Sequence, residues 1–66
     1  MQILVNSGST EVSVGLTVQG LLAELDLEHR RVAVAVNGVM VARAKQADHV
    51  LVEGDRVEIV HAVQGG

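Results

Sequence analysis

Alternation of apolar and polar residues indicates a β-hairpin at the start of the chain. Ile3 and Val5 lie on one face of an alternating run, and Val12 and Val14 lie on one face of a second run. Between them, residues 6–10 are rich in turn formers. Two alternating runs around such a cluster predict two antiparallel strands joined by a turn.

The next segment has the periodicity of an amphipathic helix. Apolar side chains recur at positions i, i+3, i+4 and i+7, namely Val18, Leu21, Leu22 and Leu25, which form one face of a helix. Thr17 precedes them as the expected N-cap. We expect Arg30 and Arg31 near the C-terminal end, where the helix dipole favours cations.

The second half of the chain predicts strands again. Residues 32–36 are apolar on both faces, which suits a central strand, and Asn37-Gly38 is a strong two-residue hairpin signal before a short strand. A polar connection with room for one helical turn follows, then a short strand and a turn at 53–55. In the last strand Val57 and Ile59 face one side, and Glu58, Val60 and Ala62 face the other.

The predicted order is ββαββ, with a short additional strand after Asn37-Gly38. One helix covers only one face of one mixed sheet of four to five strands, so the fold class is α+β. The other face of the sheet must meet water or a partner. We expect a single domain over residues 1–62, followed by a tail at 63–66.

Composition excludes several classes of function. The 66 residues contain no Cys, Phe, Tyr, Trp or Pro and carry a net charge of −3. An acidic chain without aromatic residues lacks both the basic face and the stacking platform used to bind nucleic acid. No apolar run has the length of a membrane span, and we expect a cytoplasmic protein.

The side chains offer no catalytic constellation. His29, His49 and His61 do not have the spacing of metal ligands, and no Ser-His-acid set or phosphate-binding glycine loop is visible. Lys45, the only lysine, is interpreted as a solvated loop cation. We therefore expect neither an enzyme nor a metal site.

The chain closes on Gly65-Gly66 directly after the last strand. A terminal carboxylate is an anion at neutral pH and can attack a nucleotide phosphate to form an acyl-adenylate. Glycines lack a Cβ, so such a tail is narrow enough to enter the active site of a partner enzyme.

Together these segments resemble the small sulfur carriers of thiamine biosynthesis, which are ubiquitin-like β-grasp proteins. The resemblance covers the whole chain and rests on residues 1–6, 17–22, 35–38, 41–43 and 53–60 and on the closing Gly65-Gly66. The chain departs from the usual family pattern at Ala42, often a proline, and in the loop 44–48, which often holds a tryptophan.

The resemblance implies a carrier that is a co-substrate of other enzymes. An E1-like adenylyltransferase would use ATP to adenylate Gly66, and sulfur derived from a cysteine desulfurase or a related donor would convert it to a thiocarboxylate. Thiazole synthase would then take the sulfur. The carrier itself would bind no cofactor. Gly65 and Gln64 would belong to the part that threads into the partner.

In such carriers the partner docks on the exposed sheet face beside the tail. On this chain the resemblance assigns that role to Leu4, Val41, Val60 and Ala62. Three alternatives stay open: a sulfur carrier of another pathway (the small subunit of molybdopterin synthase, or a carrier for cysteine or thio-metabolite synthesis), a ubiquitin-like protein modifier, and a plain binding module.

Overall fold

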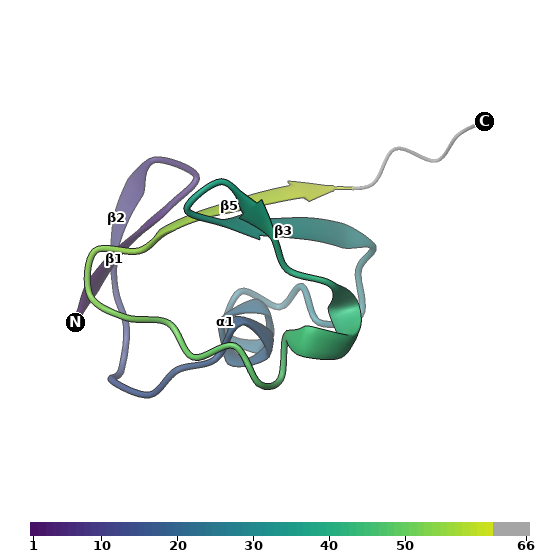
Figure 1. The fold of residues 1–66 in the computed structure, drawn as a ribbon, viewed down its shortest axis with the longest axis horizontal. Helices are drawn as coiled ribbons and strands as arrows, with labels where there is room; N and C mark the ends of the chain where they lie inside the picture. The colour runs from purple at the N-terminus through teal and green to yellow at the C-terminus, as the bar shows by residue number, and fades with distance from the viewer. Residues whose placement is uncertain (62–66) are drawn as a thin grey trace.

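A computed structural model describes residues 1–61 of the chain (Figure 1). The elements are, in order, β1 (Gln2–Val5), β2 (Gly8–Glu11), α1 (Val18–Glu24), β3 (Val32–Val36), β4 (Val39–Met40), the 3₁₀ helix η1 (Arg43–Lys45) and β5 (Arg56–His61). This is the predicted order, including the short fourth strand. Ala62 and the expected tail at 63–66 lie outside the described residues.

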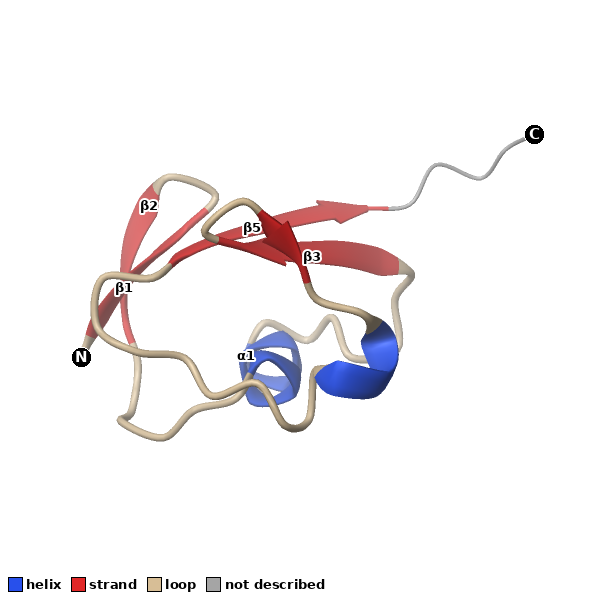
Figure 2. Cartoon of the chain, in the orientation of Figure 1, coloured by secondary structure: helices blue, strands red, loops and turns tan. Residues whose placement is uncertain are grey.

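The strands form one mixed sheet in the order β2-β1-β5-β3-β4. β1 and β5 are parallel, and the pairs β1–β2, β3–β5 and β3–β4 are antiparallel. Helix α1 lies under one face of this sheet, and no other element covers the opposite face of the described part (Figure 2). The predicted α+β class, with one helix packed on a mixed sheet, is confirmed.

The core fills the space between α1 and the sheet. Its apolar members are Ile3, Val12, Val18, Leu21, Leu22, Val34, Val36, Val41, Leu51, Val57 and Ile59. The predicted helical face is confirmed for its first three members, whereas Leu25 lies at the helix end and is 40% exposed. Thr17 is the N-cap, since its hydroxyl oxygen accepts a hydrogen bond from the Gly20 N–H at 3.0 Å.

Helix α1 is shorter than its sequence pattern indicates. Asp26 has a left-handed φ of 62°, and the Leu27 N–H donates to the Leu22 carbonyl at 2.7 Å. This six-to-one bond is typical of a Schellman ending, which is usually built on glycine and here on aspartate. The prediction that Arg30 and Arg31 lie at the helix end is wrong, because α1 has no basic residue in its last turn.

The first hairpin has a tighter turn than predicted. Asn6 and Ser7 both have positive φ, 48° and 71°, as a two-residue hairpin turn requires. β2 therefore begins at Gly8, and the prediction of a strand over Val12–Val14 is wrong. The Asn6 side chain also pairs with the Ile59 backbone, accepting from its N–H at 2.8 Å and donating to its carbonyl at 3.2 Å.

The second hairpin is fastened to the start of β5. Asn37 and Gly38 form the predicted turn, with φ of 52° and 83°. Asn37 Nδ2 donates to Asp55 Oδ1 at 2.9 Å, and Asn37 Oδ1 accepts from the Arg56 N–H at 3.0 Å. Asp55 Oδ2 accepts from the Val52 N–H at 2.9 Å. Asp55 is thus a buried carboxylate whose hydrogen bonds are satisfied, as a buried charge requires.

The strand predicted just before residues 53–55 is reduced to a single bridge. Val50 pairs only with Thr17, and the Leu51 N–H donates to the Leu16 carbonyl at 2.8 Å. The predicted turn itself is present, with Gly54 at a φ of 86°. This segment fixes the loop before α1 rather than extending the sheet.

Candidate functional site

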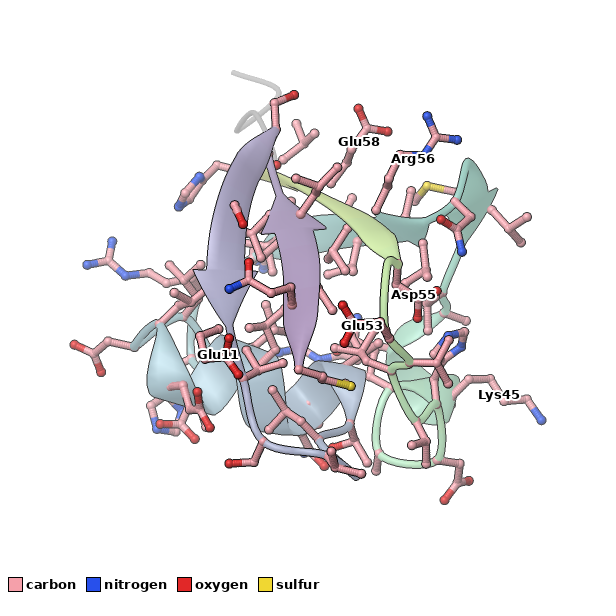
Figure 3. The ribbon with its side chains drawn as sticks, turned by 90° about the vertical axis from the view of Figure 1, so that its left-hand side faces the viewer. Glu11, Lys45, Glu53, Asp55, Arg56 and Glu58 are labelled. Carbon is pink, nitrogen blue, oxygen red and sulfur yellow. The ribbon has the colours of Figure 1, made fainter. Side chains whose placement is uncertain are left out.

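The open face of the sheet is centred on β5. Val57 and Ile59 point into the core, whereas Arg56, Glu58 and Val60 are exposed, in agreement with the predicted alternation. Figure 3 shows Arg56 and Glu58 projecting from the side of the sheet opposite the helix. Val60 follows at the same period and is 62% exposed, so β5 presents two charges and one apolar side chain to solvent.

The neighbouring strands extend this face with apolar residues. Strand register places Leu4 beside Arg56, and Ala33 beside Val60. Ala35 lies between Glu58 on β5 and Met40 on β4. Leu4 is 37% exposed and Met40 is also exposed. We call the set Leu4, Ala33, Ala35, Met40, Arg56, Glu58 and Val60 the open face. Sequence reasoning missed Met40, although the two-residue Asn37-Gly38 turn fixes its register opposite Ala35.

The structure separates the residues expected to dock a partner. Leu4 and Val60 lie on the open face. Val41 does not, because it is 7% exposed and belongs to the core. Its N–H donates to the Val34 carbonyl at 2.8 Å, which continues the β3–β4 ladder by one residue and turns the side chain inward. The expectation of an exposed Val41 is therefore wrong, and Ala62 lies outside the described residues.

A shallow hollow of about 150 Å³ lies on this face between the two hairpin turns. Leu4, Ser7, Gly38, Arg56 and Glu58 line it. The hollow is smaller than the usual range of ligand pockets, about 300–1,000 Å³. The open face is therefore better suited to a protein surface than to a small molecule.

One carboxyl near the edge of this face has a perturbed pKa. The Met1 ammonium contacts Glu11 Oε2 at 2.7 Å and lowers the pKa of the Glu11 carboxyl below its usual value. The pair therefore stabilises the folded state at pH values above the usual pKa of a glutamate, and this contribution is lost as the pH falls through the lowered pKa. Glu11 lies on the surface, so the contribution is small.

Strand β5 ends at His61, which pairs with Val32 of β3. The residues expected to carry the chemistry and to thread into a partner, Gly66, Gly65 and Gln64, lie outside the described residues. Within residues 1–61, no three His, Cys, Asp or Glu side chains gather as metal ligands do. In the same part, no helix is long and apolar enough to cross a membrane.

Comparison with known proteins identifies the family. The sequence model of the ThiS family matches residues 3–66, which include the final Gly65-Gly66. The chain belongs to the ThiS family. The chain is also similar to the sulfur carrier protein ThiS of Escherichia coli, with 35% identity over 66 residues and complete coverage of both chains. The predicted family is confirmed, and so is the expectation of a carrier protein rather than an enzyme.

A solved ThiS structure agrees with the fold. The crystal structure of the thiamine biosynthesis protein ThiS from Geobacter metallireducens matches this chain with a TM-score of 0.87, 29% identity and full coverage of both chains. With the mixed five-stranded sheet on one helix, this likeness confirms the predicted β-grasp fold.

A segment similar to the whole chain also occurs in two longer proteins. Proteins named thiazole synthase from Paramagnetospirillum magneticum and Magnetococcus marinus are 35% and 36% identical to this chain over 66 residues. The match covers the whole chain but 20% of each relative. A ThiS-like segment is thus part of a larger polypeptide in those proteins.

Proposed function

We propose that this chain carries sulfur as a thiocarboxylate on Gly66 and delivers it for the thiazole ring of thiamine. The observation that carries the proposal is the full-length similarity to a protein named sulfur carrier, together with a family match that includes Gly66. The same family match supports this pathway over the other sulfur-carrier pathways considered above.

The proposed chemistry takes place at the terminal carboxyl in two steps. In an E1-like adenylyltransferase, a carboxylate oxygen of Gly66 attacks the α-phosphorus of ATP, and pyrophosphate leaves. Hydrosulfide then attacks the acyl carbon of the adenylate, and AMP leaves as the thiocarboxylate forms. If a cysteine desulfurase supplies the sulfur as a persulfide, the resulting acyl disulfide needs a thiol reductant to release the thiocarboxylate. The chain supplies the reacting group, and its partners supply ATP binding and catalysis.

We propose thiazole synthase as the enzyme that takes the sulfur. The relatives with that name contain a segment similar to this whole chain. Joining two proteins in one polypeptide raises their effective concentration for each other, which is advantageous when the two parts act together. This supports a functional pairing between this chain and thiazole synthase.

The open face is the surface that we propose for docking. Its apolar members, Leu4, Met40 and Val60, lie around two charged side chains, Arg56 and Glu58, on a face that no other element covers in the described part. Exposed apolar side chains gathered on one face mark protein–protein interaction sites, and arginine is enriched at such interfaces. The face is on β5, the strand that runs toward Gly66.

The decisive experiment is an intact-mass measurement. The purified chain is incubated with ATP, sulfide and the E1-like adenylyltransferase of its own organism. We expect a mass gain equal to the difference between sulfur and oxygen, confined to the C-terminal peptide. Omitting ATP is the matched control and is expected to leave the mass unchanged.

Two other results would contradict the proposal. An unchanged mass with an enzyme that activates its own carrier normally would exclude the sulfur-carrier function. An amide link between Gly66 and a lysine of another protein, without a thiocarboxylate, would identify a protein modifier instead.

The docking role of the open face is tested with two exposed valines on opposite faces. Val60→Glu places a charge on the open face and is expected to raise the KM of thiazole synthase for the thiocarboxylate carrier at least tenfold, because interface centres exclude unpaired charge. Val39→Glu is the control, since Val39 is 68% exposed but faces the other way. Equal KM values for the two variants would contradict this docking surface.

A further inference from the structure

Three arginines gather at one corner of an otherwise acidic protein. The chain has 5 Lys and Arg residues against 8 Asp and Glu. Arg31 and Arg43 line an open groove of about 460 Å³ at the β3–β4 edge of the sheet. Arg30 and Arg43 line a smaller hollow of about 90 Å³ beside it, together with one acidic residue, Glu28. Arg43 thus belongs to both, and we call the combined feature the arginine groove.

These guanidinium groups are available to a partner. All three arginines are exposed. The one salt bridge among the described residues joins Met1 and Glu11, so none of the three is paired with a carboxylate of residues 1–61. Guanidinium groups bind carboxylates and phosphates in a planar, two-pronged geometry. The arginine groove therefore fits an anionic surface or ligand.

The groove lies where an enzyme acting on Gly66 must approach. Val32 lines both hollows and pairs with His61, the last residue of β5. Only five residues follow His61 in the sequence, and an extended chain of that length spans at most about 18 Å. Figure 1 shows η1, the turn that bears Arg43, on the same side of the molecule as the end of β5. A protein that holds the carboxyl of Gly66 is therefore within reach of the groove.

The groove is also continuous with the open face. Ala33 and Met40 belong to both, so a partner docked on that face extends naturally around the β4 edge. The groove is open, and its one buried polar side chain, Gln46, already donates to the Val41 carbonyl at 3.5 Å. These features fit a broad acidic protein surface and not an enclosed site for a small anion.

We propose that the arginine groove binds an acidic surface of the enzyme that adenylates Gly66. This inference rests on the proposed function and adds a second, electrostatic contact to the apolar docking face. Complementary charge of this kind speeds encounter and fixes orientation more than it adds affinity. It gives a carrier of net negative charge a positively charged surface with which to approach its partner.

The first and last residues of η1, Arg43 and Lys45, provide the test. Arg43→Glu reverses a charge in the groove. Lys45→Glu makes the same change in charge two residues later, at a side chain that lines neither hollow and projects outward in Figure 3. Pyrophosphate release by the adenylyltransferase of the same organism is measured against carrier concentration. We expect Arg43→Glu to raise KM about tenfold with kcat unchanged, and Lys45→Glu to stay within about twofold of wild type. Arg43→Lys keeps the charge but loses the two-pronged geometry, and should raise KM less than Arg43→Glu does.

Ionic strength separates steering from misfolding. The Debye length falls from about 10 Å at 0.1 M salt to about 3 Å at 1 M, so the difference between the two Glu variants should disappear at high salt. Thermal unfolding of both variants checks that the domain is intact. Equal KM values for Arg43→Glu and Lys45→Glu, or a difference that persists at high salt, would overturn the inference.

Two further measurements distinguish other molecules that could occupy the arginine groove. ATP added to the isolated chain should leave the NMR signals of Arg31 and Arg43 unchanged. Shifts at both residues would indicate a small-anion site and overturn the proposal. A defect confined to sulfur transfer by thiazole synthase, with normal adenylation, would also overturn it. Failure of the wild-type chain to be adenylated would instead contradict the proposed function.

Discussion

Replacement of Gly66 by Ala is expected to slow thiocarboxylate formation about 100-fold, because a misplacement of about 1 Å at a reacting centre costs that much. The added methyl group would lie next to the carboxyl that, under the proposed function, must align with the α-phosphorus of ATP. It also occupies space in the part of the partner's channel that, under the proposed function, holds the two bare glycines. Stability should not change, because residue 66 follows β5 and the core residues lie within 3–59.

The measurement is the rate of ATP-dependent mass gain in the C-terminal peptide, with thermal unfolding recorded on the same samples. Gln64→Ala is the matched control, since it shortens a side chain at a position that already has a Cβ, and we expect a change of only a few-fold. Thiocarboxylate formation at the wild-type rate in Gly66→Ala would show that the tail does not need a bare glycine at its end.

Truncation of Leu21 to Ala is expected to destabilise the domain by about 3–5 kcal/mol, the range for leucines in well-packed cores. Leu21 is 1% exposed and lies on the face of α1 that covers the sheet. A domain of 66 residues has a free energy of unfolding of about 3–10 kcal/mol in total. The variant should therefore be partly unfolded without denaturant or lose most of its stability.

Urea unfolding followed by far-ultraviolet circular dichroism measures this loss, because the chain has no Trp or Tyr to report by fluorescence. Leu25→Ala is the control on the same helix. Leu25 is 40% exposed at the helix end and should cost less than about 1 kcal/mol. Similar losses for the two variants would mean that α1 does not pack on the sheet as described.

Sequence reasoning succeeded where one local signal determined the structure. The Asn37-Gly38 turn needs positive φ at both positions, and few residue pairs adopt it readily. The helical face and its Thr17 cap follow from spacing and from one side-chain hydrogen bond. The alternation in β5 correctly predicted that Val57 points into the core and that Val60 is exposed. Each of these features depends on residues close together in sequence.

Sequence reasoning failed mainly where the structure depends on contacts that form only when the chain has folded. The Asn6-Ser7 turn moved β2 toward the N-terminus, and Asn6 is held in place by Ile59 from the other end of the described chain. Val41 is a different kind of error, because the hydrogen bond to Val34 that turns its side chain inward joins two residues of the same hairpin. The arginine groove was missed because Arg31 and Arg43 come to one groove only in the folded chain.

The position of β5 in the sheet has a consequence for folding kinetics. β5 is the last strand in sequence, yet it lies between β1 and β3 and joins the two halves of the sheet. Both hairpins are local and should form within microseconds. The parallel β1–β5 pairing must close a loop of nearly the whole chain, which is a slow step. We therefore expect the halves to form first and β5 to join them late. An incompletely folded chain would then lack a β5 fixed between its neighbours, so under the proposed function its partners would discriminate against it before any ATP is spent.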